Sequence, residues 1–273
     1  MEKLKNLIPV ALTVCLILIV FVAGVFLGQI MQNSSGSGQA VAPGTASSAY
    51  EEVPDDNTYP ASSETLGGRQ ALFLREGDRF TFGNYKQGAY GEIRPIEWRV
   101  LSVSDGKALL ISDKILDCLP YNRSDVGVSW ENSTLRGWLN TDFLGEAFSS
   151  SEQSRIVTVN NQNPNNPKTN TYGGSSTSDK VFCLDCQQAQ SYFSNSFDRM
   201  AAPTEYTINK GGYVSTTYSI GTGEHTGWWW LRTPGSASDQ ACMVDSAGAI
   251  RTGGLSVGRR EGTVRPALWI YLD

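Results

Sequence analysis

Histidine chemistry has a single candidate in this chain. His225 is the only histidine, so these residues cannot supply a multi-histidine metal site of the H-E-x-x-H type. His225 lies in the glycine-rich stretch GTGEHTG, which is typical of an exposed loop because glycine favours turns over regular structure. We therefore interpret His225 as a solvated loop residue and not as a general base.

Serine chemistry is suggested by one formal motif. Residues 254–258 read Gly-Leu-Ser-Val-Gly and fit the G-x-S-x-G nucleophile elbow of hydrolases. That elbow needs a buried strand before it, a helix after it and a histidine later in the chain. The flanking residues are polar and glycine-rich, and no histidine follows. We interpret the match as a coincidence.

Carboxylates are numerous in the C-terminal part of the chain. A glycosidase needs two of them at a defined separation, and no sequence pattern pairs them here. The acidic residues considered are Glu97, Asp113, Asp117, Asp142, Asp179, Asp185 and Asp198. We predict no catalytic residue and no cofactor.

Thiol chemistry has four candidates outside the N-terminal segment: Cys118, Cys183, Cys186 and Cys242. Cys183 and Cys186 form a C-x-x-C, but a zinc site needs a second pair of ligands at suitable spacing, and none is present. We predict no metal site. Unpaired buried thiols and a local disulfide remain alternatives, and a redox motif is the less favoured third one.

The elements that would position these residues begin with strands. Alternating apolar residues predict strands over residues 79–85 and 96–103. Asp105-Gly106 predicts a hairpin turn into a further strand over residues 108–112. The start of the domain is therefore expected to be antiparallel sheet.

The middle and the end of the chain mix helices and strands. One helix is predicted from apolar residues at helical spacing after a Ser133 cap; these residues are Leu135, Trp138, Leu139 and Phe143. Further strands are expected over residues 154–160, 180–184, 227–232, 240–246, 249–254 and 264–272, with a long irregular loop over 161–179 and a short helix over 185–193. The sequence predicts an α+β domain with mostly antiparallel sheet and long loops.

The N-terminal residues predict one transmembrane helix. Residues 7–30 contain no charged side chain, and as a helix they would extend about 36 Å, enough to cross a hydrocarbon core of ~30 Å. Lys3 and Lys5 precede this segment and keep the N-terminus in the cytoplasm by the positive-inside rule. A cleaved signal peptide with its cut near Ala23 is the alternative, but its apolar region would be unusually long.

The composition then divides the chain into three parts. Residues 1–32 are the cytoplasmic stub and anchor, residues 33–69 are a tether of Ser, Gly, Pro and acidic residues, and residues 70–273 are the extracellular domain. The tether has too few large apolar residues to fold alone. The chain carries a formal net charge of −5, and its outer domain is nearly neutral, so nucleic acid is excluded as a partner.

Several segments in order resemble a known family. They are IEWRVLSVSDGKALLIS, LDCLPYN, SWENSTLRGWLNTDF, DKVFCL, GWWWLRTPGS and TVRPALWIYL. Together they resemble an uncharacterised extracytoplasmic domain family of Gram-positive bacteria, over roughly residues 75–273. The resemblance implies a C-type-lectin-like fold, and some fold-mates look like the variable proteins of diversity-generating retroelements. The calcium and sugar signatures of true C-type lectins are absent.

The resemblance implies that the C-terminal residues bind a ligand. Residues 228–231 and 264–272 would be a fixed apolar frame, and small or polar residues between them would be exposed on turns, where binding residues concentrate. The predicted ligand-binding residues are Ser236, Ser238, Asp239, Gln240, Asp245, Arg251, Arg259 and Arg260. The alternative is that they are solvated turns that bind nothing.

The tryptophans of the frame raise a second expectation. They could stack on sugar rings, but side chains of a strand alternate between its faces. We therefore expect Trp229 to differ in exposure from Trp228 and Trp230. Arg232 and Arg265 are expected to form hydrogen bonds inside the scaffold.

These observations predict a single-pass, membrane-anchored binding module of the bacterial cell surface. It would recognise a protein or a carbohydrate ligand without catalysis, and would contact the membrane through residues 7–30. Two alternatives stay open: a cell-envelope enzyme that uses carboxylates for hydrolysis, and a structural or sensory surface protein.

Overall fold

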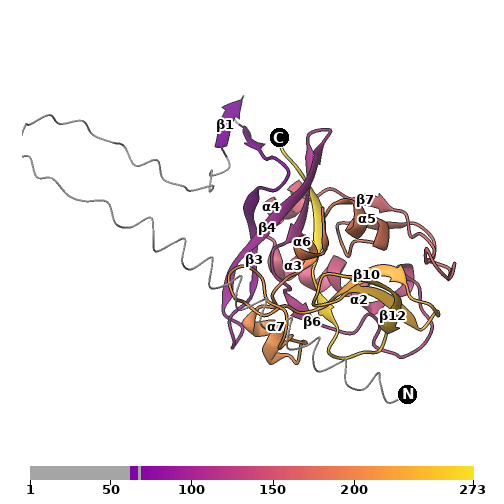
Figure 1. Cartoon of the computed structure of the whole chain (residues 1–273). Coiled ribbons are helices and arrows are strands. Elements are labelled where there is room, and N and C mark those ends of the chain that lie inside the picture. The colour runs from indigo at the N-terminus through magenta and orange to yellow at the C-terminus, as the bar shows by residue number, and fades with distance from the viewer. Residues whose placement is uncertain (1–61, 67–68) are drawn as a thin grey trace, which may run out of the picture. The chain divides into compact units, whose positions relative to one another are not determined.

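The computed structural model describes residues 62–66 and 69–273 (Figure 1). The predicted anchor, residues 1–32, and most of the predicted tether, residues 33–69, lie outside the described residues. None of the helices described in the remaining chain has the length and apolar character that a bilayer span requires.

The main sheet confirms the mixed, mostly antiparallel architecture. It contains five strands in the order β3-β4-β5-β14-β9, and every neighbouring pair is antiparallel. The last strand of the chain therefore lies inside the sheet, between β5 and β9 (Figure 1). The strands are β3 (Arg79–Lys86), β4 (Ile93–Ser104), β5 (Lys107–Ser112), β9 (Val181–Phe182) and β14 (Ala267–Tyr271).

The predicted hairpin at Asp105-Gly106 is confirmed. Both residues have positive φ, 51° for Asp105 and 68° for Gly106, which is the conformation that a two-residue turn between twisted strands requires. The turn joins β4 to β5, with Ser104 opposite Lys107. On β5, Leu109, Leu110 and Ile111 are fully buried.

A second sheet supports the C-terminal turns. Its order is β10-β11-β12, antiparallel throughout, with an irregular register in both ladders. The strands are β10 (Trp229–Pro234), β11 (Gln240–Val244) and β12 (Ile250–Ser256). Shorter antiparallel pairs join β1 (Ser62–Leu66) to β2 (Arg69–Phe73), β6 (Asp117–Cys118) to β13 (Thr263–Val264), and β7 (Val159–Asn161) to β8 (Thr177–Asp179).

The predicted helix after Ser133 is confirmed. The Ser133 hydroxyl accepts a hydrogen bond from Arg136 N, so it caps the helix. The helical segment then buries Leu135, Leu139 and Phe143 on one face, while Trp138 is half-buried. Its successive parts are η2 (Trp130–Asn132), α2 (Thr134–Trp138), the π-helical turn η3 (Leu139–Phe143) and α3 (Leu144–Ala147).

The prediction of a strand over residues 154–160 is wrong at its start. Residues 150–155 form the helix α4 (Ser150–Arg155), because Ser149 and Glu152 make a reciprocal capping box that nucleates a helical turn. Only β7 remains extended in this region. The short helix predicted over 185–193 is confirmed as α5 (Cys186–Ser191), capped by Asp185. Two more short helices follow, α6 (Ser196–Arg199) and α7 (Glu205–Asn209).

The expectation that Trp229 differs in exposure from its neighbours is wrong. All three tryptophans are buried, with Trp228 at 5% and Trp229 and Trp230 at 0%. Their side chains do alternate, but both faces of β10 are covered: Trp228 and Trp230 pack edge to face, and Trp229 stacks against the Arg265 guanidinium. None of the three is available for a sugar ring.

The predicted role of Arg265 inside the scaffold is confirmed. This side chain is fully buried and donates hydrogen bonds to backbone oxygens of Ser112, Asp113 and Arg199. Burial lowers the pKa of its guanidinium to about 9. These three carbonyls, from two separate segments, compensate in part for the desolvation of the charge, so Arg265 ties the residues before β14 to the end of β5 and the end of α6.

Candidate binding site

The predicted ligand-binding residues lie on the turns of the second sheet. Six of them are exposed and two are half-buried, so none belongs to the hydrophobic core. The exposed ones are Ser236, Ser238, Asp239, Arg251, Arg259 and Arg260, and the half-buried ones are Gln240 and Asp245. The sheet, however, does not bring all eight together.

Six of the eight form one surface at the β10–β11 turn. Gln240 pairs with Ser256 in the ladder, and Val257 N donates to Asp239 O across 2.9 Å. These contacts place the segment after β12 beside the turn. We call this surface the polar face; it consists of Ser236, Ser238, Asp239, Gln240, Arg259 and Arg260.

Asp245 and Arg251 lie at the opposite end of β11. Arg251 Nε donates to Asp245 Oδ2 across 2.6 Å, and Asp245 Oδ1 accepts hydrogen bonds from Ala247 N and Ala249 N. These contacts close the β11–β12 turn, so the pair has a structural role of its own. The structure therefore separates Asp245 and Arg251 from the polar face.

The side chains of the polar face differ in whether they already form hydrogen bonds within the protein. Ser236 Oγ donates to Gln240 Oε1 across 2.6 Å, and Arg259 Nε donates to Glu261 Oε1 across 2.7 Å. The side chains of Ser238, Asp239 and Arg260 make no hydrogen bond or ion pair with any described residue. Their polar groups are therefore directed to solvent or to a ligand.

Asp125 borders the polar face and was not predicted from the sequence. Its carboxylate accepts hydrogen bonds from Ser256 Oγ at 2.5 Å and from Gly258 N at 3.3 Å. Its loop is also tied to the turn, because Val128 N donates to Ser238 O across 2.9 Å. Asp125 lies in an irregular polar stretch with no periodicity, so only the long-range contacts identify it.

The asparagine-rich loop, residues 162–176, lies beside the same sheet. Asn166 is almost fully buried, and its side-chain nitrogen donates to Pro234 O and Thr252 O, both at 2.8 Å. Its side-chain oxygen accepts from Lys168 N and Thr169 N. One amide therefore fixes the loop against both β10 and β12.

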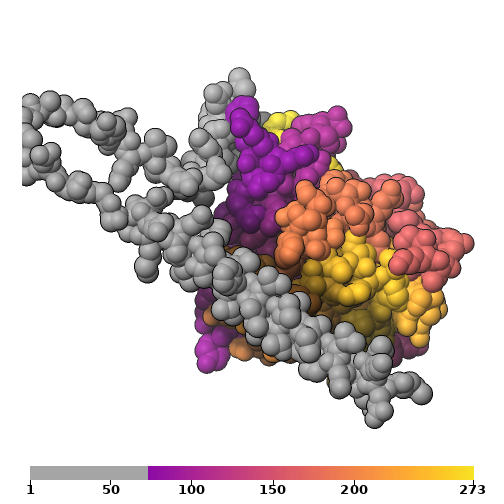
Figure 2. All heavy atoms as spheres, viewed as in Figure 1, coloured from indigo at the N-terminus to yellow at the C-terminus, as the bar shows by residue number. Residues whose placement is uncertain are grey.

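The same loop carries an exposed aromatic residue to the edge of the polar face. Thr171 Oγ1 donates to Ser236 O across 3.1 Å, and the neighbouring Tyr172 is 67% exposed. In Figure 2 part of the C-terminal segment, in yellow, lies on the surface beside the salmon-coloured loop. An exposed ring next to polar groups is the combination that aromatic platforms use.

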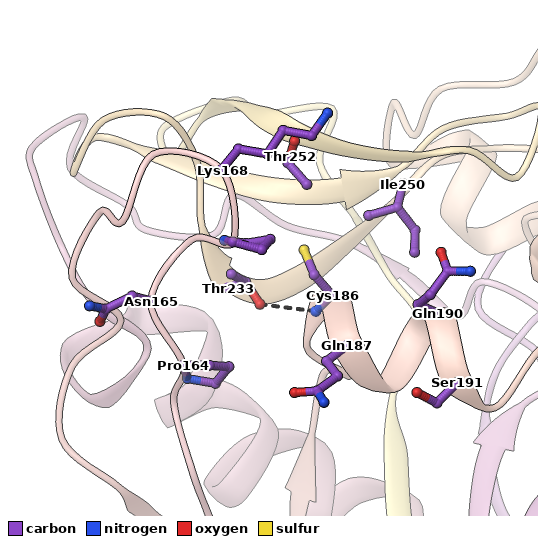
Figure 3. A pocket seen from close by; sticks show the side chains of 11 residues that line it. Pro164, Asn165, Lys168, Cys186, Gln187, Gln190, Ser191, Thr233, Ile250 and Thr252 are labelled. Atoms are coloured by element: carbon purple, nitrogen blue, oxygen red, sulfur yellow. Dashed lines mark hydrogen bonds between the residues drawn. The ribbon is translucent and has the colours of Figure 1, made fainter.

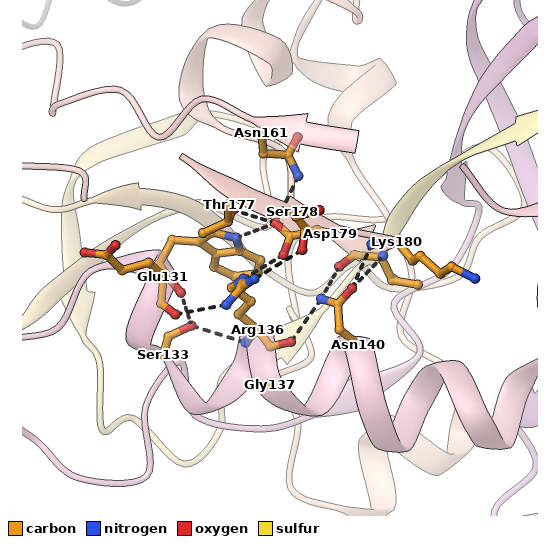
Figure 4. A network of polar contacts seen from close by, with 12 residues as sticks. Glu131, Ser133, Arg136, Gly137, Asn140, Asn161, Thr177, Ser178, Asp179 and Lys180 are labelled. Carbon is orange, nitrogen blue, oxygen red and sulfur yellow. Dashed lines mark hydrogen bonds and ion pairs between the residues drawn. The ribbon is translucent and has the colours of Figure 1, made fainter. Parts of the chain in front are cut away.

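The end of the loop is held by a buried carboxylate. Asp179 is 1% exposed, and Figure 4 shows the donors that surround it. They are Arg136 Nε at 2.6 Å, Thr177 Oγ1 at 2.7 Å, and Trp130 Nε1 and Asn161 Nδ2 at 3.1 Å. Each oxygen of the buried charge is thereby satisfied, and the loop is fixed at β8.

A pocket of about 530 Å³ opens between the loop, α5 and the second sheet (Figure 3). Cys186 and Gln190 line it from α5, and Ile250 and Thr252 line it from β12. The loop contributes two prolines, an amide and an ammonium group: Pro164, Asn165, Pro167 and Lys168. No pattern in the sequence predicted this pocket, since its walls come from three distant segments.

The four thiols of the described residues are free and buried. This agrees with the alternative of unpaired buried thiols and not with a local disulfide. Burial raises the pKa of Cys118 to about 11 and that of Cys183 to about 12. Cys186 differs: its pKa is lowered by a hydrogen bond from Cys242.

Three buried carboxylates form ion pairs, and His225 lies at the surface. His225 is exposed, as predicted. Asp117 pairs with Lys210, Asp179 with Arg136, and Asp185 with Arg232. Each of these three buried carboxylates is therefore held by a cation, and within residues 62–66 and 69–273 no cluster of three or more His, Cys, Asp or Glu side chains is suited to a metal ion.

Residues 105–272 match a family model described as "Domain of unknown function (DUF6273)". The matched range begins at the β4–β5 turn and includes the second sheet, the loop and the pocket. Neither the curated proteins nor the solved structures give a match to this chain.

Proposed function

The chain belongs to the DUF6273 family, and from the geometry of its polar face we propose that it is a non-catalytic binding module. The proposal includes the membrane anchor over residues 7–30 and display of the domain at the bacterial cell surface. It also includes the lectin-like fold and the similarity to variable proteins of diversity-generating retroelements that the sequence segments imply. The ligand is a protein or a glycan.

The observation that supports this proposal most is the contrast between scaffold and surface. Of the strands under the polar face, β10 is fully buried and β11 is buried except for Gln240, whereas β12 is half-buried or exposed. The side chains of Ser238, Asp239 and Arg260 are exposed and have no partner among the described residues. A surface held by a rigid scaffold loses little conformational entropy when it binds a ligand. Most of the interaction free energy between its polar groups and the ligand then contributes to affinity.

The chemistry of the polar face favours a ligand rich in both donors and acceptors. Asp239 accepts hydrogen bonds, Arg260 donates them, and the Ser238 hydroxyl does both. Tyr172 adds an exposed ring beside Ser236. Saccharides and exposed polypeptide backbone present this combination of hydroxyl or amide groups with small apolar faces.

Arrays of glycans and peptides probed with the detergent-solubilised full chain test the proposal. We expect binding to one class, and a loss of at least about tenfold in affinity when Asp239→Ala or Arg260→Ala removes a central polar contact. Arg251→Ala is the matched control, because Arg251 is an exposed arginine of the same sheet outside the polar face. Unchanged affinity in both polar-face variants, or equal loss in the control, would contradict the proposal.

A further inference from the structure

The walls of the pocket between the asparagine-rich loop, α5 and the second sheet are joined by hydrogen bonds. Asn166 ties the loop to Pro234 O of β10 and Thr252 O of β12. Cys186 N donates to Thr233 Oγ1 across 3.0 Å, which ties the start of α5 to β10. A ligand therefore meets walls that are already in place, and binding costs little conformational entropy.

The size and the walls of this pocket suit a small molecule. Its volume of about 530 Å³ lies within the range of roughly 300–1,000 Å³ that is typical of ligand sites. Pro164 and Pro167 from the loop and Ile250 from β12 supply apolar surface, so a ligand gains free energy by burying an apolar group there. In Figure 3 Pro164 of the loop and Gln190 of α5 lie on opposite sides of the pocket.

The pocket carries one positive charge. Lys168 is the only charged residue among the described residues that line it. Within the described part of the chain, the ammonium group of Lys168 has no hydrogen-bond or ion-pair partner; only its backbone N–H is bonded, to Asn166 Oδ1. A cation without a carboxylate in the same lining favours a ligand that bears a single negative charge.

The helix α5 adds amide groups that are free to bind. Gln187 and Gln190 both line the pocket and are exposed. They are three residues apart and therefore neighbours on the helix surface. Neither side chain forms a hydrogen bond with another described residue. A primary amide both donates and accepts, so the two glutamines can pair with the N–H and the C=O of an amide in the ligand.

We propose that this pocket binds a small carboxylate that also carries an amide and an apolar side chain, which is the chemistry of an N-acylated amino acid. The carboxylate accepts hydrogen bonds from the Lys168 ammonium group. The amide pairs with Gln187 and Gln190, and the apolar side chain packs against Ile250 and the two prolines. The same chemical group ends a peptide chain, so a free molecule and a peptide carboxyl terminus are two sources of one ligand chemistry.

This site is separate from the polar face. No residue of the polar face lines the pocket, so the inference does not depend on the proposed function. Asp239→Ala, which tests the polar face, should leave binding in the pocket unchanged, and the two proposals can therefore fail independently.

Ligand-observed NMR titrations of the detergent-solubilised full chain test the inference. The probes are N-acetyl-leucine, N-acetyl-leucine amide, which lacks the charge, and N-acetyl-glycine, which lacks the apolar side chain. We expect each of the last two to bind at least about fivefold more weakly than N-acetyl-leucine. Equal affinity for N-acetyl-leucine and its amide, or no binding of N-acetyl-leucine at millimolar concentration, overturns the inference.

An acetylated tetrapeptide that ends in leucine distinguishes the two sources of the ligand. Binding at least as tight as that of N-acetyl-leucine assigns the pocket to peptide carboxyl termini, and weaker binding assigns it to a free molecule. Either result supports the ligand chemistry, provided that the charged probe is preferred over the neutral one.

Variants locate the binding in the pocket. Lys168→Gln should lower the affinity for N-acetyl-leucine at least about fivefold and leave the affinity for its amide unchanged. Arg251→Gln is the matched control: Arg251 is exposed and lies on β12 between Ile250 and Thr252, which both line the pocket. Its side chain therefore projects from the opposite face of the strand, and its removal should leave the affinity unchanged. Equal loss in both variants overturns the inference.

A third variant fills the pocket. Gln190→Trp places a large ring at an exposed position of α5 and should abolish binding of all the probes; full affinity in this variant also overturns the inference. Near-ultraviolet circular dichroism shows whether each variant is folded. Where a variant fails to fold, the comparison of N-acetyl-leucine with its amide on the wild-type chain decides.

Discussion

Arg232 Nη2 donates to Asp185 Oδ2 across 2.6 Å inside the core. Arg232 belongs to β10, which supports the polar face, and Asp185 caps α5, which carries Cys186. Arg232 also donates to Cys183 O and Gln162 O. One buried ion pair therefore connects the second sheet, the pocket helix and the start of the asparagine-rich loop, and it confirms the expectation that Arg232 acts inside the scaffold.

Replacement of Asp185 should destabilise the whole domain. Asp185→Ala leaves the Arg232 guanidinium buried without its countercharge and removes the cap of α5, so we expect a loss of about 3–5 kcal/mol in the free energy of unfolding. Urea unfolding followed by tryptophan fluorescence measures it. Arg251→Ala is the control: it breaks an ion pair in which the Arg251 side chain is 62% exposed, and should cost less than about 1 kcal/mol.

A second prediction concerns the asparagine-rich loop. Asp179→Asn removes the charge that Arg136, Trp130, Thr177 and Asn161 all contact, so the loop should detach more readily at β8. We expect amide hydrogen exchange over residues 162–176 to become at least about tenfold faster, which corresponds to about 1.4 kcal/mol of local opening free energy. Asp142→Asn, at an exposed position, should leave the exchange rates as they are; equal acceleration by both variants would contradict the role given to Asp179.

The elements that the sequence predicted correctly are those with local signals. Asp105-Gly106 specifies its hairpin through its own backbone preference, and Ser133 specifies a helix start through one contact three residues away. The helix α4 has an equally local signal, the capping box of Ser149 and Glu152, but the strand predicted over residues 154–160 rests on the apolar residues that follow it. Local patterns thus account for these three element boundaries.

The arrangement of the site depends on contacts that no local pattern encodes. Asp239 lies next to Val257 because of the ladder register, and the same register separates Asp245 from the polar face. Asp125 reaches the polar face, and Asn166 reaches β10, only through the tertiary fold. Exposure of the turns was predictable from composition, whereas their grouping into one surface was not.

Alkaline pH should destabilise the domain through Tyr121. Burial raises the pKa of Tyr121 well above its ordinary value of 10.0, and its hydroxyl donates to Arg232 O across 2.9 Å. The unfolded chain loses this proton near pH 10 and the folded chain keeps it, so the stabilisation is complete below pH 10 and decreases as pH rises above it. Urea midpoints measured from pH 7 to 11 should fall above pH 10. Tyr121→Phe should lower stability by about 1 kcal/mol at pH 7 and make the alkaline fall smaller; an unchanged slope would contradict this assignment.

The sequence also predicts how the domain reaches its site of action. Residues 7–30 should keep the full chain in the membrane fraction after washing with high salt or carbonate, since an apolar span is held by hydrophobic transfer and not by charge. Deletion of residues 1–32 should release the remaining chain into the soluble fraction. Protease added to intact cells should digest residues 70–273, because the two lysines before the span orient the N-terminus inward. Release of the intact chain by salt, or protection of the domain until the cells are lysed, would contradict the predicted topology.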